Sequence, residues 1–301
     1  MKRILGSFEG DEKGPLVILL GGMHGNEVAG VRAINEVFRV LEEGHIPIKG
    51  KIVGISGNLK ALEENKRFID YDLNRVWNDG YVSLLLNDHE AFEYAEDLEG
   101  LHLYETLTHH SRGDYTTRIL VDLHTTSAEN GNFIVIPEDE ANNAIVKALH
   151  LPVVVDLDKY LEGTLLKFMH DQGYISFAFE GGQIGSSKAL LLHTSGIWEV
   201  LNAAGSIEPL HNDEFDKYSR VLKEMAESLP KTVKVLYRHY VDDGDAFRMI
   251  NGYHNFQKVS KGEVLAEDKF GKVTSPLDGM IFMPLYQEAG NDGFFIVEEV
   301  S

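Results

Sequence analysis

The chain has 301 residues and a mass of 33.7 kDa, enough for one large domain with a smaller one beside it. It contains no cysteine, which excludes disulfides, a cysteine nucleophile and thiolate zinc ligands. Its 28 basic and 48 acidic residues leave a formal charge of −20, which repels phosphate backbones. We therefore expect no nucleic-acid partner, and any zinc must be held by histidine and carboxylate.

The amino-terminal residues Met1, Lys2 and Arg3 are not followed by the apolar core of a signal peptide. The apolar run at residues 16–20 is too short to span a bilayer. Together with the absence of cysteine, these features predict a cytoplasmic protein with no membrane partner. The sequence does not decide the oligomeric state and leaves a homo-oligomer open.

Apolar runs alternate with helical patterns through the first three quarters of the chain. Strands are expected at residues 16–20, 51–55, 119–123, 133–136, 153–155 and 175–179, and helices at residues 28–41, 84–109, 141–149, 188–201 and 213–229. The runs show no clean polar alternation, which is typical of strands that helices bury on both faces. The pattern predicts an α/β fold with a mostly parallel or mixed sheet flanked by helices.

The composition changes after Pro230, which ends the last helical pattern. Short runs separated by glycines follow, with the spacing of a small antiparallel barrel or sandwich. We expect an α/β domain at residues 1–229 and a small all-β domain at residues 230–301. No low-complexity linker separates them, so the β domain is expected to pack on the first.

Candidate metal ligands follow two of the predicted strands. His24 and Glu27 are three residues apart on the loop after residues 16–20, at a strand's carboxyl end, where open α/β sheets place their sites. Imidazole nitrogen and carboxylate oxygen are zinc ligands, and a catalytic zinc site needs a third. His124, at the end of the run 119–123, is the best candidate. The remaining histidines are expected at the surface.

Asp122 and His124 are two residues apart, so on a strand their side chains share a face. Asp122 could therefore accept the second N–H of a metal-bound imidazole. A short-range salt bridge would explain the pair equally well.

Glu180 ends the run 175–179 and precedes Gly181 and Gly182. A carboxylate in that position can take a proton from a metal-activated water and return it to a leaving nitrogen. Taken alone, it could equally be a helix cap or a loop carboxylate.

Residues 67–77 interleave arginine, aspartate and asparagine. Arg67, Asn74 and Arg75 supply the donors that amide cleavage needs for a developing oxyanion and for a substrate carboxylate. Such a run is also typical of a surface salt-bridge network, and only its combination with the metal candidates favours the catalytic interpretation.

These segments, in this order, resemble the succinylglutamate desuccinylase and aspartoacylase family of zinc hydrolases, which share the carboxypeptidase fold. The matching segments are residues 22–27, 57–58, 67–77, 122–127 and 180–182. The resemblance implies that His24, Glu27 and His124 bind one zinc ion per chain and that Glu180 is the base and proton shuttle. It also implies that Arg67 polarises the scissile carbonyl, and that Asn74 and Arg75 hold the substrate's carboxylate.

The chain departs from the family in two places. Aspartoacylases and desuccinylases have a further arginine shortly before the catalytic glutamate, whereas this chain has none between Arg118 and Arg220; Lys159, Lys167 or Lys188 would replace it only as a point charge. Where aspartoacylases have a substrate-binding tyrosine, this sequence offers Phe294 and Phe295. We therefore expect substrates with one carboxylate or a neutral side chain to be preferred over dicarboxylic ones.

The C-terminal segment has its own resemblance. Residues 262–266 and 273–281 are similar to the barrel-sandwich hybrid fold of biotinyl and lipoyl carriers, but no lysine follows Gly279 to receive a cofactor. We expect a structural module that walls one side of the active site.

The sequence thus predicts a zinc-dependent deacylase that cleaves an N-acyl amide bond of a small, carboxylate-bearing substrate with a metal-activated water. A metallocarboxypeptidase would use the same fold and ligands. A non-catalytic protein that binds a metal or a partner is disfavoured because binding alone does not need Glu180.

Overall fold

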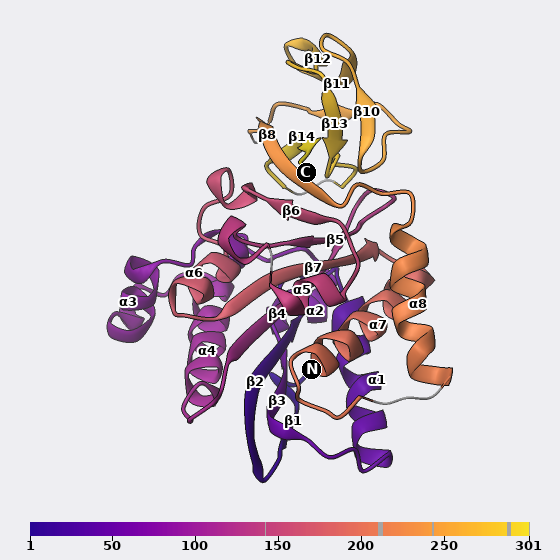
Figure 1. Ribbon diagram of the computed structural model, residues 1–301. Coiled ribbons are helices and arrows are strands. Elements are labelled where there is room, and N and C mark those ends of the chain that lie inside the picture. The colour runs from indigo at the N-terminus through magenta and orange to yellow at the C-terminus, as the bar shows by residue number, and fades with distance from the viewer. Residues whose placement is uncertain (142, 210–212, 243, 288–289, 301) are drawn as a thin grey trace.

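The structure is a computed structural model that describes residues 1–300 apart from residues 142, 210–212, 243 and 288–289. Eleven strands of the described residues form one mixed sheet (Figure 1). In spatial order they are β1 (Ile4–Glu9), β3 (Lys49–Ser56), β2 (Glu12–Gly21), β4 (Arg118–Thr126), β7 (Ile175–Gln183), β5 (Asn132–Val135), β6 (Val153–Val155), β8 (Thr232–Tyr240), β14 (Asp292–Glu299), β13 (Gly279–Phe282) and β10 (Gln257–Val259).

The centre of this sheet is parallel. Strand β2 pairs in parallel with β3 and β4, and β4 pairs in parallel with β7. The carboxyl ends of these strands therefore meet at one edge, and the register sets Gly21 beside Leu123 and His124 beside Glu180. The strands continue past the apolar runs, so His124 and Glu180 lie within β4 and β7 rather than after them.

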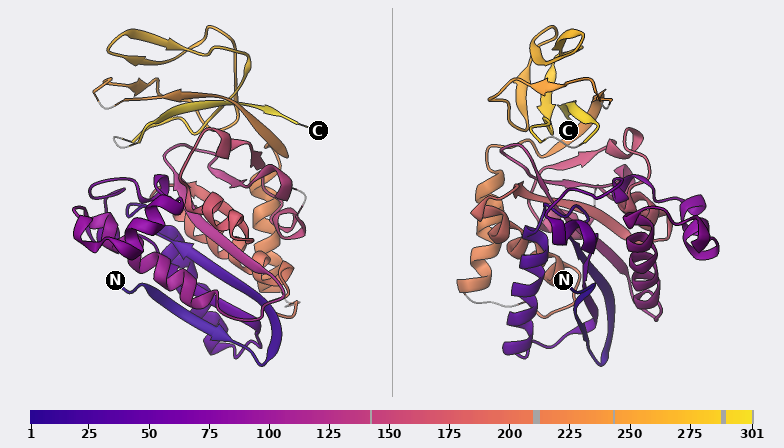
Figure 2. Two further views of the ribbon diagram at one scale, coloured as in Figure 1. Left: turned by 90° about the vertical axis from the view of Figure 1, so that its left-hand side faces the viewer. Right: turned by 180° about the vertical axis from the view of Figure 1, so that it is seen from behind.

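Helices cover both faces of the sheet, as Figures 1 and 2 show. One face packs against α3 (Asp79–Asn87), α4 (Ala95–His110) and α6 (Leu165–Asp171). The other packs against α1 (Ala29–Glu43), α5 (Ala144–Ala148), α7 (Ser187–Ala203) and α8 (Asp213–Ala226). The short helix α2 (Leu59–Glu64) follows β3.

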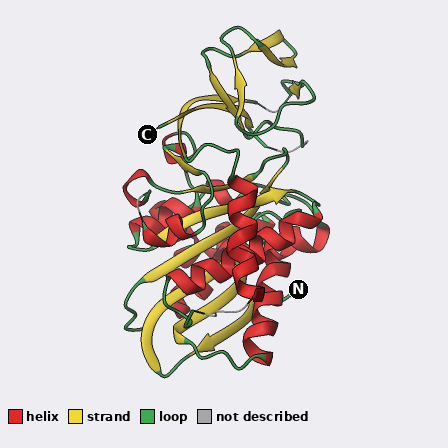
Figure 3. Cartoon of the chain, turned by 45° about the vertical axis from the view of Figure 1, so that its right-hand side comes forward, coloured by secondary structure: helices red, strands yellow, loops and turns green. Residues whose placement is uncertain are grey.

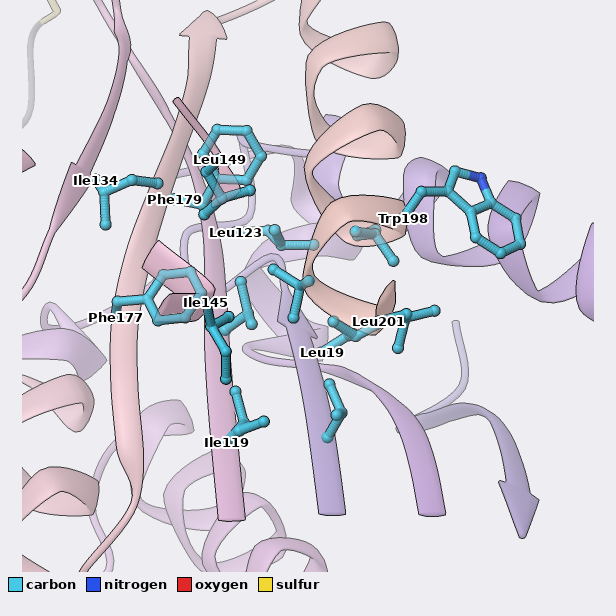
Figure 4. Close-up of a cluster of buried hydrophobic side chains, with 14 of the residues drawn as sticks. Leu19, Ile119, Leu123, Ile134, Ile145, Leu149, Phe177, Phe179, Trp198 and Leu201 are labelled. Atoms are coloured by element: carbon cyan, nitrogen blue, oxygen red, sulfur yellow. The ribbon is translucent and has the colours of Figure 1, made fainter. Parts of the chain in front are cut away.

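Strand β2 explains why its apolar run does not alternate. Val17 and Leu19 belong to the core on the α1 and α7 side, whereas Leu16, Ile18 and Leu20 belong to the core on the α4 side. Figure 4 shows part of the first core, between the sheet and α7. Both faces of the strand are buried, so both need apolar side chains. This confirms the predicted α/β class.

The helix expected at residues 84–109 is wrong as a single element. Helix α3 ends at Asn87, a 3₁₀ turn follows at His89–Ala91, and α4 begins at Ala95. The Asp97 carboxylate accepts the backbone N–H groups of Glu93 and Tyr94, each at 2.9 Å. These bonds give α4 its own amino-terminal cap and separate it from α3.

The described residues after Pro230 form strands without helices (Figure 3). Strands β9 (Arg248–Met249), β11 (Val264–Asp268) and β12 (Gly271–Thr274) make a small antiparallel sheet. Met249, Leu265 and Phe294 belong to a common core between this sheet and the end of the large one. The predicted small antiparallel C-terminal sheet is confirmed.

Strand β8 pairs in parallel with β6 and antiparallel with β14, so the large sheet continues across the expected boundary at Pro230. The division into residues 1–229 and 230–301 stays a prediction. Among the helices that the structure describes, none combines the length and the apolar character needed to cross a membrane.

Candidate active site and metal centre

His24 and Glu27 lie on the loop between β2 and α1. The N–H of Glu27 donates to the carbonyl of His24 at 3.1 Å, a turn that brings the two side chains together. Gly25 lets this loop lie against α2, since a Cβ there would be 2.0 Å from the carbonyl carbon of Ala61. The N–H of Gly25 also donates to the carbonyl of Arg67 at 3.1 Å. The local sequence thus joins the candidate metal loop to the segment that carries Arg67.

The three candidate ligands meet in one buried cluster. His24 Nδ1 is 2.9 Å from Glu27 Oε1, and His124 Nδ1 is 3.2 Å from Glu27 Oε2. The Thr125 N–H donates to the same Glu27 oxygen at 2.8 Å. His24, Glu27 and His124 each offer a ligand atom, and these atoms lie within 4.8 Å of one another.

The chemistry of this cluster fits zinc. Two imidazole nitrogens and one carboxylate are a donor set that zinc accepts, and catalytic zinc sites commonly use three protein ligands. The three side chains are buried, at 4%, 3% and 5% exposure for His24, Glu27 and His124. Buried charged groups need a partner, and a cation at this point would supply one.

A carboxylate lies behind each imidazole. Asp122 Oδ2 is 2.9 Å from His124 Nε2, which is the proximity expected from their spacing on one strand. Asp72 Oδ1 is 3.1 Å from His24 Nε2. The sequence pattern did not single out Asp72, because it lies 48 positions from His24 along the chain, beyond α1, β3 and α2. Both aspartates can orient an imidazole so that its Nδ1 faces the cluster.

The electrostatics of the cluster favour a bound cation. Burial disfavours a charged imidazole, but the carboxylates of Asp122 and Glu27 raise the pKa of His124 well above its ordinary value. Burial also opposes ionisation of Glu27, yet His24 and His124 lower the pKa of this carboxyl. The carboxylates around His124 thus favour positive charge at this point, and a divalent metal that displaces the imidazole proton would be held by the same carboxylates.

Glu180 faces the same pocket from β7. It is buried, and its Oε2 has no hydrogen-bond partner among the described residues. Burial raises the pKa of its carboxyl to about 8; His124 opposes this rise, whereas Glu27 adds to it. A cation in the cluster would lower the pKa again. Glu180 is therefore a buried carboxyl group with one oxygen that no described group binds.

Gly181 is required beside Glu180 because of the packing beneath it. A Cβ at Gly181 would be 2.3 Å from Nε2 of His193 on α7. That Nε2 is 2.9 Å from the carbonyl oxygen of His124, to which it can donate. The ring thus supports the backbone of a candidate ligand.

Among the described residues, the expectation that the other histidines lie at the surface is wrong for two. His193 is fully buried and His110 is nearly so. Burial lowers the pKa of His193 to about 4, which keeps its ring neutral. A signal was present, since His193 shares the buried face of α7 with Ala189, Leu192 and Ile197.

Arg67 joins the cluster through its acidic neighbours. Its Nη2 is 3.0 Å from Asp72 Oδ2 and its Nη1 is 3.5 Å from Glu27 Oε1. Its Nε is buried without a described partner. Arg67 lines the pocket together with Glu180, so an N–H donor is available near the candidate base.

Asn74 and Arg75 belong to the 3₁₀ turn Leu73–Arg75, which Asp72 caps by accepting the Asn74 N–H at 2.9 Å. Asn74 Oδ1 accepts the N–H of Leu165 at the start of α6, at 2.9 Å. Arg75 Nη2 is 3.1 Å from Asp292 Oδ2. Both residues line the pocket, as expected, and both are also tied to the protein.

The structure corrects the interpretation of Phe294 and Phe295. Both are fully buried in the cores of the C-terminal strands, and neither is among the described residues that line the pocket. Lys159, Lys167 and Lys188 are likewise absent from that lining; Lys159 is paired with the buried Asp156, and Lys167 with the exposed Asp171. The C-terminal wall of the pocket is formed instead by residues that include Met283, Leu285 and Asp292.

The model of the succinylglutamate desuccinylase/aspartoacylase catalytic domain matches residues 13–194. Among similar proteins, the succinylglutamate desuccinylase of Pseudomonas paraeruginosa is 26% identical over 85% of this chain and 75% of its own. A probable aspartoacylase of Acaryochloris marina is also 26% identical, over 89% of this chain and 80% of its own.

Solved structures show the same fold. The crystal structure of a succinylglutamate desuccinylase/aspartoacylase from Rhodobacter sphaeroides has a TM-score of 0.66 at 19% identity and covers 98% of this chain and 88% of its own. The product-bound structure of an ectoine utilization protein from Ruegeria pomeroyi has a TM-score of 0.66 at 18% identity, covering 97% of this chain and 87% of its own. Because the catalytic-domain model matches more than half of this chain's residues, the chain belongs to the succinylglutamate desuccinylase/aspartoacylase family of deacylases.

Proposed function

We propose that the protein is a zinc-dependent deacylase that cleaves the N-acyl amide bond of a small substrate carrying a carboxylate. One observation carries this proposal: the His24, Glu27 and His124 cluster shares a buried pocket with the unpartnered carboxylate of Glu180. A metal site that only binds would not need a free carboxylate beside it.

His24, Glu27 and His124 would hold one zinc ion per chain. When bound, zinc supplies Lewis-acid chemistry, which polarises a carbonyl and makes a water molecule more acidic. Asp72 and Asp122 would keep the two imidazoles in the orientation that ligation requires.

Glu180 would move the proton. Its Oε2 would take a proton from the attacking water and deliver it to the leaving nitrogen, so that the amine departs neutral. Burial raises the pKa of this carboxyl to about 8, and the cationic charge of the site would bring it down toward the working pH. The same oxygen can therefore act first as base and then as acid.

Arg67 would stabilise the charge that develops on the scissile carbonyl oxygen. Its guanidinium is buried and held by Asp72 and Glu27, so little reorganisation is needed during the reaction. The Asn74 side-chain amide and Arg75 would hold the substrate's carboxylate. The Asn74 oxygen is already used by Leu165, which leaves the NH₂ group as its donor.

We also propose that the chain divides into a hydrolase domain at residues 1–229 and a β domain at residues 230–301, and that it acts in the cytoplasm. The β domain contributes Met283, Leu285 and Asp292 to the pocket wall. The lack of cysteine is compatible with a reducing compartment.

The test is an activity screen with N-acyl amino acids and short peptides on one preparation whose metal content is measured. We expect about one zinc per chain, hydrolysis of N-acyl amino acids in preference to peptides, loss of activity on chelation and recovery with zinc. Preferential release of C-terminal residues from the peptides would identify the protein as a carboxypeptidase instead of a deacylase. Full activity after complete metal removal would overturn the proposal.

A further inference from the structure

Arg75, proposed above to hold the substrate's carboxylate, already has an acidic partner inside the protein. Its Nη2 is 3.1 Å from Asp292 Oδ2, and its Nη1 donates to the Asn74 carbonyl at 2.9 Å. Arg75 and Asp292 both line the pocket. The residues come from distant parts of the chain, since 217 positions separate them.

Asp292 is held from its other side by a second arginine. Arg238 Nε donates to Asp292 Oδ1 at 2.7 Å, and Arg238 Nη1 donates to the carbonyl of Tyr160 at 2.7 Å. The Asp292 side chain is only 14% exposed. One internal carboxylate therefore lies between two guanidinium groups, of which Arg75 lines the pocket and Arg238 lies behind the lining.

No other cation among the described pocket-lining residues is free to bind a second carboxylate. Apart from the two imidazoles, these residues include the cations Arg67 and Arg75, and Arg67 is paired with Asp72 and Glu27. The acidic members of the lining are Glu27, Asp122, Asp158, Glu180 and Asp292. A second carboxylate on the substrate would be buried among like charges without a partner, which is strongly unfavourable.

The rest of the pocket wall is largely apolar. Its apolar members include Ile136, Leu157, Leu161, Leu166, Met283 and Leu285. Such a surface accommodates an uncharged acyl group or side chain and gives no compensation to a charged one.

We propose that Asp292 is a specificity-determining residue that excludes dicarboxylic substrates. Its one negative charge against Arg75 and Arg238 leaves a single net positive charge, which the substrate's first carboxylate takes up at Arg75, so that no cation remains for a second carboxylate. The substrates are then N-acyl amino acids with a single carboxylate and an uncharged remainder. This inference rests on the proposed deacylase function and adds the substrate class.

The test compares two isosteric substrate pairs, N-acetylaspartate with N-acetylasparagine and N-acetylglutamate with N-acetylglutamine, on the zinc-loaded enzyme. The quantity measured is the ratio of kcat/KM between the acidic and the amide member of each pair. A general loss of folding or zinc lowers both members equally and leaves the ratio unchanged. In the wild type the amide member is expected to be the better substrate.

Asp292→Asn should raise the acidic-to-amide ratio at least about tenfold, because bidentate arginine–carboxylate contacts are among the stronger charged interactions. The double variant Asp292→Asn with Arg238→Gln should lose most of this gain, since it lacks the second arginine. Asp245→Asn is the matched control: it removes a 2.9 Å pair with Lys269 in the same C-terminal segment and does not line the pocket. This control should leave the ratio unchanged.

The proposal is overturned if Asp292→Asn leaves the ratio within about twofold of wild type, or if the wild type prefers the acidic members by about tenfold. If the wild type cleaves none of the four substrates, the deacylase proposal fails for this substrate class. The inference is then decided by calorimetric binding of aspartate and asparagine to the same variants. Tighter relative binding of aspartate by Asp292→Asn supports it, and unchanged relative binding rejects it.

Discussion

Glu96 is expected to hold the segment that carries Arg67 and Asp72. It lies in the first turn of α4 and is fully buried. Its Oε1 accepts Asn58 Nδ2 at 2.9 Å and the Ile69 N–H at 2.8 Å. Its Oε2 accepts the N–H groups of Asp70 and Tyr71, at 3.0 and 3.4 Å. One carboxylate thus fixes three consecutive backbone donors.

Glu96→Gln keeps the shape of this side chain but not its bonding. Each Glu96 oxygen accepts from two N–H groups. In either orientation the glutamine NH₂ group therefore faces two N–H groups and leaves them without an acceptor. The less costly orientation puts the NH₂ toward Asp70 and Tyr71, whose contacts are longer than those to Oε1. Each buried donor left unpaired costs about 1–3 kcal/mol, and the loss of the longer Tyr71 contact should cost about 1 kcal/mol. The variant should therefore lose about 2–4 kcal/mol of unfolding free energy.

A loss of that size is a large part of the roughly 5–15 kcal/mol that stabilises a typical domain. Urea unfolding measures this loss. The kcat/KM of the folded variant should also fall, because Arg67 and Asp72 flank residues 69–71 and would be displaced with them. Glu105→Gln is the control, since it removes the same charge from an exposed position on α4 and should stay within about 0.5 kcal/mol of wild type. If Glu96→Gln matches Glu105→Gln in both stability and kcat/KM, the reasoning about the loop is wrong.

Three further outcomes are expected. His24→Ala and His124→Ala should each abolish zinc binding in elemental analysis of the purified protein, because two remaining ligands make an inadequate site; full zinc in both variants would contradict the ligand assignment. Glu180→Gln should keep the metal and the fold but lose about 10²–10⁴-fold in kcat, and near-normal turnover would identify another group as the base. Gly181→Ala should lower the unfolding free energy by about 1–3 kcal/mol, because the new Cβ would lie 2.3 Å from the buried His193 ring; unchanged thermal unfolding would show that α7 moves aside freely.

Much of the fold and of the candidate metal cluster could be predicted from local patterns. The apolar run of β2 ends where the chain turns, so His24 and Glu27 had to lie at a carboxyl edge of the sheet. The alternation of side chains along β4 sets Asp122 and His124 on one face. These inferences succeed because the period of a strand and the position of its end are properties of a few neighbouring residues.

The limits of the pattern appear within the same chain. The helical period of the sequence could not locate the break between α3 and α4. That break depends on the Asp97 carboxylate, which caps α4 by accepting the N–H groups of Glu93 and Tyr94. Phe294 and Phe295 were placed in the pocket by their position along the sequence. In the sheet, the register between β8 and β14 shifts between Asp292 and Phe294, and it is Asp292 that lines the pocket.

By itself, the sequence determined the α/β class, the family and the residue types of the candidate metal cluster, since these follow from periodicity and from ligand spacing along short stretches. Only the tertiary structure decided what surrounds that cluster. The contacts of Asp72 with His24, of His193 with His124 and of Asp292 with Arg75 join positions 48, 69 and 217 residues apart. Such contacts depend on how strands are ordered and registered in the sheet, and the free energy that sets this order is spread over the whole core rather than encoded at either partner.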